Sequence, residues 1–291
     1  MSEASRLRSS GSNWKDLRPR LISAVVLILV AGGAIWAGGP FYEVLILLAM
    51  CGLASEMAAL FGLSVRSWRG VLYLGWAVCA GLAACAGRWS AIAAFPMTAF
   101  LFGTPLWLGN AAIVAAGSAL LWLRLHTLPG AWSVVFPIAV VVASDSSAYL
   151  VGRLVGGPKL APRISPGKTR SGAVGGLCGA ILAGMLVASL AGVDGMMERT
   201  SLLLRSGVWA ALLGVVAQAG DLAESAVKRA RGVKDSGTLL PGHGGLLDRF
   251  DAMLAVMPLA AVLSLAAQPG FGFWTVGLAD LVEAISHVFG Q

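Results

Sequence analysis

Long apolar runs separated by short polar segments cover almost the whole chain. A helix needs about 20 largely apolar residues to cross a hydrocarbon core about 30 Å thick, so runs of that length predict membrane spans. We expect about nine of them, near residues 21–38, 41–62, 70–87, 89–103, 105–123, 132–151, 172–193, 207–224 and 251–267. The pattern predicts an all-α, polytopic integral membrane protein, in which a disordered cytoplasmic arm at residues 1–17 precedes a single transmembrane domain at residues 18–291.

Three apolar segments admit a second interpretation. The run at 89–103 is short and contains Pro96, which is typical of a broken or re-entrant helix. The tail at 271–290 carries two acids and a histidine, so we expect an interfacial or partly inserted helix, with a tenth span as the alternative. The first run resembles a signal peptide, but its leading polar region is long and its apolar stretch reaches full spanning length, which favours an uncleaved helix.

Composition excludes most other classes of protein. The chain is 57% hydrophobic and 12% charged, with a mean hydropathy of +0.81, whereas soluble domains are about 25% charged. The same figures exclude a disordered chain. The 38 glycines follow no three-residue period, and four cysteines are too few for a disulfide framework. All four cysteines lie inside apolar runs, where we expect them to be packing residues.

Basic residues concentrate on one side of the predicted membrane. Of the 21 lysines and arginines, 17 fall in the segments 1–20, 63–69, 152–171 and 225–250. Cytoplasmic loops carry such an excess, so we expect the N-terminus and these segments to face the cytoplasm. The net charge of +7 follows from this asymmetry. Because no aromatic residues interleave with the basic ones, we expect no nucleic acid partner.

Acidic residues at membrane depth are costly and usually functional. Four lie within or at the ends of predicted spans: Glu43, Glu56, Asp145 and Asp221. Asp221 also begins a polar stripe with Glu224, Ser225 and Lys228, whose spacing of i, i+3, i+4 and i+7 places them on one helix face. This stripe predicts a cytoplasm-facing polar cavity. A salt-bridged helix end with snorkelling side chains is the alternative.

A glycine-rich loop leads into the last predicted span. Residues 240–245, LPGHGG, place three glycines around His243 and let the backbone approach a ligand closely. Asp248 and Asp251 then share one face at a helix N-terminus, which suits carboxylates and metal-bound phosphate. A simple capping turn is the alternative, and it would give the aspartates no ligand.

Asp221 and Asp248 both lie at cytoplasmic ends of predicted spans. Hard carboxylate oxygens bind Mg²⁺, which also bridges substrate phosphates. Lysines and arginines of the connecting segment would hold the remaining phosphate oxygens. Asp145 and the basic residues of 152–171 form a second polar group on the same side. Together these features indicate phosphoryl or nucleotidyl transfer.

Residues 167–169, GKT, imitate the end of a phosphate-binding P-loop. The first glycine of that motif falls at Pro162, and we expect no strand before it, so this interpretation is excluded.

The C-terminal half resembles bacterial phosphatidate cytidylyltransferase, the CDP-diacylglycerol synthase family. The similar segments are DSSAY at 145–149, GR at 152–153, KLAP at 159–162, SPGKT at 165–169, GDLAES at 220–225, SAVKR at 225–229, KD at 234–235 and PGHGGLLDRFD at 241–251. The N-terminal half is similar only in hydropathy. The family often continues SPxKT with WEG, whereas this chain has RSG, so a role for an acid at Ser171 is not carried over.

The resemblance implies that CTP and phosphatidic acid give CDP-diacylglycerol and pyrophosphate, in phospholipid biosynthesis at the bacterial inner membrane. It further implies a homodimer, lipid supplied from the inner leaflet, CTP from the cytoplasm, Mg²⁺ held by Asp221 and Asp248, and a monovalent cation such as K⁺. The catalytic residues expected are Asp221, Asp248, Lys228, Lys234, Asp235, His243, Arg249 and Asp251. The substrate-binding residues expected are Lys168, Ser165, Thr169, Ser225, Arg229, Asp145, Arg153 and Lys159.

Two other functions fit parts of this pattern. A CTP-dependent enzyme acting on another lipid phosphate or a polyprenol would need the same site chemistry. A transporter would also have many spans and intramembrane acids. Transporters usually show internal repeats and sites at the bilayer midplane, whereas these acids gather at one membrane face.

Overall fold

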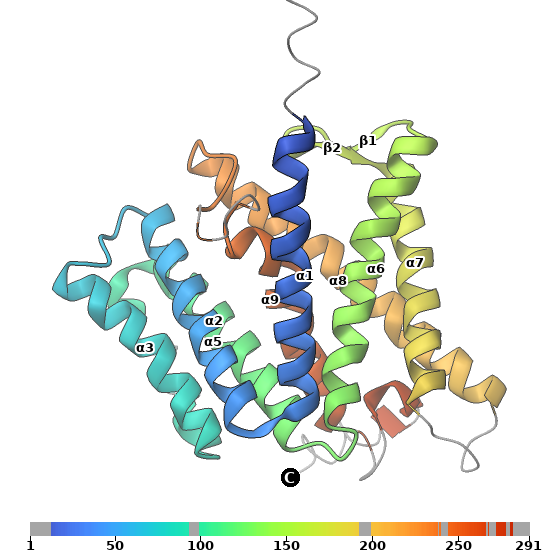
Figure 1. Ribbon diagram of the computed structural model, residues 1–291, viewed down its shortest axis with the longest axis horizontal. Helices are drawn as coiled ribbons and strands as arrows, with labels where there is room; N and C mark the ends of the chain where they lie inside the picture. Colours follow the sequence, from blue (N-terminus) through green and yellow to red (C-terminus); the bar gives the residue numbers. More distant parts are fainter. Residues whose placement is uncertain are drawn as a thin grey trace, which may run out of the picture.

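The computed structural model describes residues 13–92, 99–191, 199–237, 239, 244–265, 267, 272–277 and 280–281, with side chains from residue 25 onward, and it is mainly helical (Figure 1). The helices are α1 (Asn13–Ala37), α2 (Gly39–Leu60), α3 (Trp68–Cys85), α5 (Thr104–Leu125), α6 (Ala131–Leu154), α7 (Arg170–Leu190), α8 (Arg199–Ala230) and α9 (Leu247–Leu265), with short 3₁₀ helices η2 (Ala99–Phe102) and η3 (Phe273–Thr275).

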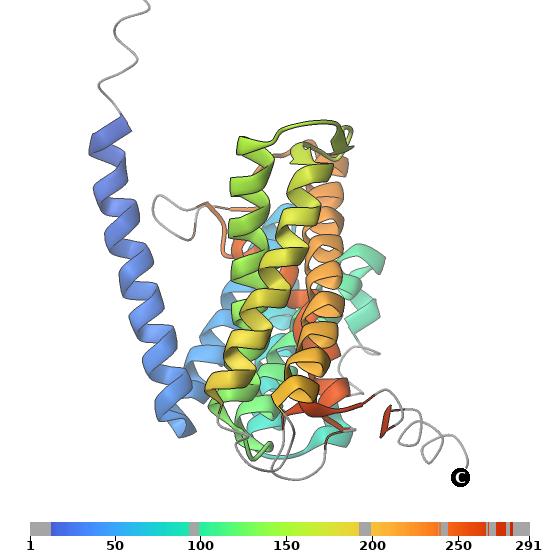
Figure 2. The same cartoon turned by 90° about the vertical axis from the view of Figure 1, so that its right-hand side faces the viewer.

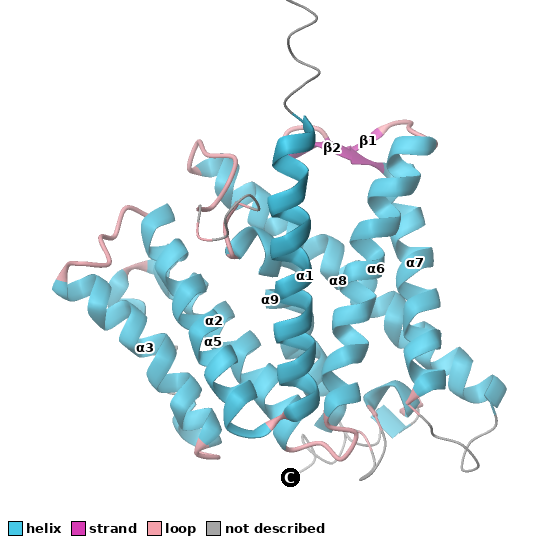
Figure 3. Cartoon of the chain, viewed as in Figure 1, coloured by secondary structure: helices cyan, strands magenta, loops and turns pink. Residues whose placement is uncertain are grey.

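A small β-hairpin corrects the all-α expectation (Figure 3). Strands β1 (Lys159–Ala161) and β2 (Ser165–Thr169) pair antiparallel between α6 and α7. Glycines and prolines are frequent from residue 156 to 167, and they disfavour a helix, so this segment folds back on itself. The expectation that no strand precedes Pro162 was therefore wrong, because β1 ends at Ala161. The missing first glycine, at Pro162, still excludes a P-loop.

Six helices are long and apolar enough to cross a membrane: α2, α3, α5, α6, α7 and α8. They match six of the expected spans, and the described residues do not support a count of nine. The part of α1 that is described with side chains, Val25–Ala37, is apolar but covers less than a full span, and α9 has charged residues in its first turn. Residues 93–98 of the fourth expected span, residues 1–12 of the expected arm and most of the tail 271–290 lie outside the described residues. α1 already begins at Asn13, inside the segment expected to be a disordered arm.

The polar segments gather at one end of the helical bundle. The hairpin and the beginning of α1 lie at the same end as the C-terminal turns of α8 (Figure 1). α8 has 32 residues, about 48 Å at 1.5 Å per residue, which exceeds a hydrocarbon core of about 30 Å. Its polar stripe therefore extends beyond the apolar part of the bundle.

Glycines bring α6 and α7 into close contact beside α8 (Figure 2). A Cβ atom at Gly175 would lie 2.5 Å from the Cβ of Val151, and one at Gly179 would lie 2.1 Å from the hydroxyl oxygen of Ser147. Only glycine fits at these positions. This is the close packing that a small-xxx-small spacing permits in lipid, where apolar burial gives little driving force.

The bundle has two halves, one formed by α2, α3 and α5 and the other by α6, α7 and α8. α9 connects them, because it packs against both α8 and α5 and also touches α2. α5 is the most deeply buried of the six candidate spans. α1 stands to one side of the other helices (Figure 2) and leaves Ile28 and Leu29 exposed. The N-terminus of α9 thus lies where the two halves meet the polar end.

Candidate active site

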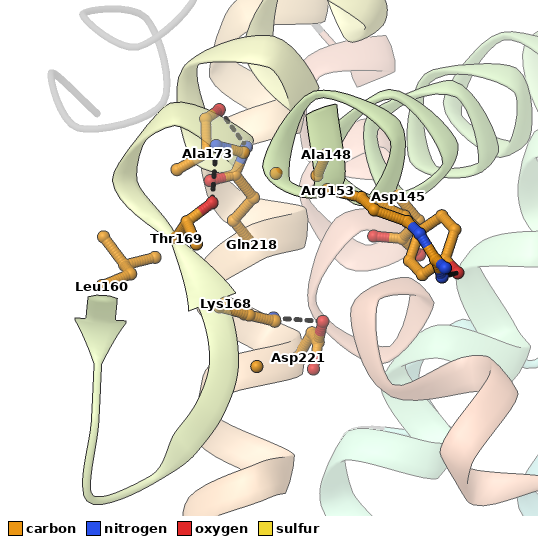
Figure 4. Close-up of a pocket in the computed structure, with 13 residues that line it drawn as sticks. Asp145, Ala148, Arg153, Leu160, Lys168, Thr169, Ala173, Gln218 and Asp221 are labelled. Atoms are coloured by element: carbon orange, nitrogen blue, oxygen red, sulfur yellow. Dashed lines mark hydrogen bonds and ion pairs between the residues drawn. The ribbon is translucent and has the colours of Figure 1, made fainter. Parts of the chain in front are cut away.

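An ion pair between the hairpin and α8 forms the first part of the site. Lys168, on β2, pairs with Asp221, which lies 53 residues later in the chain (Figure 4). Ser225 donates its hydroxyl hydrogen to the other oxygen of Asp221 at 3.4 Å. The hydroxyl oxygen of Thr169 accepts a hydrogen bond from the N–H of Gly172 and caps α7. Because this cap joins β2 directly to the start of α7, it fixes the position of Lys168 next to α8.

A cavity of about 450 Å³ lies beside this ion pair, between α6, the hairpin, α7 and α8 (Figure 4). Pockets that bind small molecules have volumes of about 300–1,000 Å³. Five predicted site residues line it, namely Asp145, Arg153, Lys168, Thr169 and Asp221. Arg153 donates a hydrogen bond to the hydroxyl of Tyr149 at 2.9 Å, and Gln218 donates to the carbonyl of Ala173 at 3.0 Å. The cavity is therefore polar on the α8 side, and several of the side chains that line it are held by hydrogen bonds.

Lys228 joins α8 to the start of α9. Its ammonium nitrogen lies 2.7 Å from a carboxylate oxygen of Glu224 and 2.7 Å from one of Asp248. The three side chains are only 12%, 8% and 14% exposed, respectively. The polar stripe predicted on α8 is thus a set of close contacts, and Lys228 is shared between two carboxylates.

Asp248 also holds the loop before α9. Its carboxylate accepts hydrogen bonds from the backbone N–H of Ser236 at 3.1 Å and from that of Gly245 at 2.9 Å. Burial alone would raise the pKa of Asp248, but Lys228 and the two N–H groups outweigh it and lower that pKa below its ordinary value. The contact with Gly245 is the capping interaction considered as an alternative role. Asp248 therefore has a structural role in addition to any ligand it binds.

Magnesium binding can be tested against the chemistry of these groups. Within the described residues, no three side chains of the His, Cys, Asp and Glu types form a metal cluster. Three further acids, Asp145, Glu224 and Asp251, lie close enough to Asp221 to interact with it electrostatically. Mg²⁺ at phosphate-transfer sites needs only one or two protein carboxylates, because substrate oxygens and waters complete its shell. Asp221 and Asp248 fit such an ion when it arrives with phosphate, and each now carries a lysine ammonium.

The remaining predicted residues lie around this centre. Lys234, Asp235 and Arg249 are exposed near it, and Ser165 and Lys159 lie in the strands of the hairpin. Arg229 donates a hydrogen bond to the carbonyl of Ile164 at 3.3 Å and so connects α8 with the hairpin turn. His243, with Pro241 and Gly242, lies outside the described residues.

Sequence reasoning gave no role to one buried acid next to the site. Glu56, on α2, accepts a hydrogen bond from the backbone N–H of Leu247 at 2.7 Å and one from the hydroxyl of Ser236 at 3.4 Å. Its only sequence signal is that it is an acid inside a predicted span. Gln218, which lines the cavity, likewise interrupts an apolar run of α8.

Comparison with known proteins gives one family. The model of the cytidylyltransferase family matches residues 18–266. A phosphatidate cytidylyltransferase of Brucella abortus is 37% identical over 264 residues, which cover 84% of this chain and 92% of that protein. Those of Staphylococcus saprophyticus and Staphylococcus epidermidis are 40% and 45% identical over 152 and 130 residues, covering 52% and 45% of this chain and 56% and 48% of theirs. These matches confirm the resemblance seen in the C-terminal motifs, and the chain belongs to the cytidylyltransferase family.

Proposed function

We propose that this chain transfers the cytidylyl group of CTP to phosphatidic acid, giving CDP-diacylglycerol and pyrophosphate. The observation that carries the proposal is the paired arrangement of Lys168 with Asp221 and Lys228 with Asp248, at the polar end of an apolar bundle. The Brucella relative, which aligns with 84% of this chain, is a phosphatidate cytidylyltransferase, and this supports the choice of substrates.

The reaction joins two anions, and the basic residues offset their repulsion. An oxygen of the lipid phosphate attacks the α-phosphorus of CTP, and the bond from that phosphorus to the bridging oxygen of pyrophosphate breaks. Lys168 and Lys228 would bind phosphate oxygens inside the site, and Arg229, Lys234 and Arg249 would bind them at its rim. A phosphate monoester is already ionised near neutral pH, so no general base is required. His243 is therefore not assigned the role of a base.

Asp221 and Asp248 would hold Mg²⁺, which would neutralise charge on the triphosphate and the leaving group. The role of the chain itself is to keep these two carboxylates on separate, packed helices. Glu224 holds Lys228 from α8, while the N–H groups of Ser236 and Gly245 hold Asp248 from the loop. Asp145 and Asp251 place further carboxyl oxygens around Asp221, and oxygen ligands of this kind suit a cation.

The cavity has a flank that suits a lipid. Leu150, Leu154 and Val155, at the end of α6, are 57%, 75% and 71% exposed. We propose that phosphatidic acid reaches the cavity along this apolar flank from the inner leaflet, and that CTP arrives from the cytoplasm. The accumulation of basic residues at the same end supports this orientation. The homodimer implied by the resemblance belongs to the same proposal.

The test uses purified protein in detergent with Mg²⁺, phosphatidic acid and CTP labelled at either the α- or the γ-phosphorus. Cytidylyl transfer places the α-label in the lipid fraction and releases the γ-label as pyrophosphate. A CTP-dependent lipid kinase would instead place the γ-label in the lipid when a polyprenol is supplied. Folded protein that labels no lipid in either arm would overturn an enzymatic function.

A further inference from the structure

Glu56 is a buried acid from the half of the chain that carries no motif. The residue is 5% exposed, and 191 positions separate it from Leu247, whose backbone N–H it binds. Burying a carboxyl group is costly unless its hydrogen bonds are formed. A buried acid on an apolar helix therefore indicates that its contacts serve the structure around it or the site.

Both contacts of Glu56 fall at the ends of one loop. Leu247 is the first residue of α9, so its N–H belongs to the first turn, where no acceptor exists within the helix. The carboxyl oxygen Oε2 of Glu56 supplies that acceptor at 2.7 Å and also receives the hydroxyl of Ser236 at 3.4 Å. A single oxygen on α2 thus fixes the beginning and the end of the segment 236–247.

The backbone of this loop is packed tightly against the carboxyl group. A Cβ atom at Gly237 would lie 2.6 Å from Oε1 of Glu56, and one at Gly245 would lie 2.8 Å from Oε2. Within the described part of the chain, Oε1 has no hydrogen-bond partner of its own. The two glycines therefore let the described ends of the loop pack against Glu56.

The same loop holds Asp248. Ser236, which donates its hydroxyl to Glu56, also donates its N–H to Asp248, and Gly245, packed against Glu56, donates a second N–H. We propose that Glu56 is a positioning residue, which fixes the loop so that its N–H groups keep Asp248 in place for cytidylyl transfer. The effect on turnover rests on the proposed function, whereas the anchoring of the loop does not.

Two variants of equal size separate hydrogen bonding from packing. Glu56→Gln keeps an oxygen acceptor, and Glu56→Met fills a similar volume without one. Amide hydrogen exchange of peptides covering Leu247 reports the anchoring, and steady-state kinetics with phosphatidic acid report the positioning. Glu43→Met is the matched control, because Glu43 lies on the same helix near its opposite end. Gly237→Ala is a second perturbation that leaves Glu56 intact and tests the same contact if Glu56→Met fails to fold.

We expect exchange at the start of α9 to rise about tenfold in Glu56→Met, as for the loss of a buried hydrogen bond, and to change little in Glu56→Gln, which keeps an acceptor. Turnover should fall about tenfold or more in Glu56→Met, with a nearly unchanged KM for phosphatidic acid. Gly237→Ala should show the same rise in exchange and the same fall in turnover. Equal exchange in Glu56→Gln, Glu56→Met and the wild type would overturn the anchoring. Raised exchange with unchanged turnover would overturn the positioning role alone. A wild type that makes no CDP-diacylglycerol would overturn the proposed function while the exchange result stands.

Discussion

Lys228 provides the sharpest test of the site, because one ammonium group serves two buried carboxylates. Glu224 and Asp248 both lie 2.7 Å from it, and all three side chains are less than 15% exposed. Replacing Lys228 by Met keeps most of the side-chain volume and removes the cation. Removing one partner of a buried ion pair costs about 3–5 kcal/mol. At about 2 °C per kcal/mol for a chain of this size, the melting temperature should fall by about 6–10 °C.

The assay is thermal unfolding in detergent, monitored by the fluorescence of the 10 tryptophans. Arg66→Met is the control, because Arg66 is exposed in the connection between α2 and α3 and should change the melting temperature by about 1 °C or less. Adding Glu224→Gln to Lys228→Met removes one of the two orphaned charges, so it should restore part of the loss. A Lys228→Met variant that melts with the wild type would refute the conclusion that this lysine holds α8 to α9.

Three further predictions concern Asp248 and the packing of α6 against α7. Asp248→Asn should reduce cytidylyl transfer by about 100-fold or more, because a charged group in the site is lost, and should change the Mg²⁺ dependence of the rate; near-normal turnover would exclude it as a ligand. The pKa of Asp248 is lowered below its unfolded value of about 3.9, so its stabilising effect is complete above that value and is lost as pH falls through the folded pKa. The difference in melting temperature between the wild type and Asp248→Asn should therefore be constant near neutral pH and narrow below about pH 4; a difference that widened in acid would contradict this sign. Gly179→Val should lower the yield of folded protein, because a Cβ there lies 2.1 Å from Ser147, whereas Gly75→Val in α3, which meets no atom within 4 Å, should not.

Hydropathy predicts where most helices lie, because the length of an apolar run fixes a span. The run expected at 41–62 is α2 at Gly39–Leu60, and the run expected at 132–151 lies within α6 at Ala131–Leu154. The run expected at 251–267 is α9 at Leu247–Leu265. α9 begins four residues before the apolar run, because the carboxylate of Asp248 accepts the N–H of Gly245 and so stabilises a polar first turn.

The contacts of the site were harder to predict. The motifs predicted that Lys168, Asp221, Lys228 and Asp248 belong to one site. They did not predict which lysine pairs with which carboxylate. The pairing of Lys168 with Asp221 depends on the hairpin, whose strands are short and whose second strand contains proline and glycine, so the sequence gives no strand signal there. Glu56 meets Leu247 only because α2 and α9 are neighbours in space, and no local pattern in the sequence records that.

The two lysine–aspartate pairs have a consequence for how substrates enter an apolar bundle. A site with bare carboxylates would repel every phosphate that approached it, and one with bare ammonium groups would be costly to bury. Here the two aspartates and the two lysines of these pairs already have a counter-ion before substrate arrives. When phosphate oxygens reach the site, the ammonium groups of Lys168 and Lys228 can exchange one anion for another without losing their neutralisation. If substrate binds here as proposed, its binding is an ion exchange, and much of the desolvation of the charged groups is completed when the protein folds.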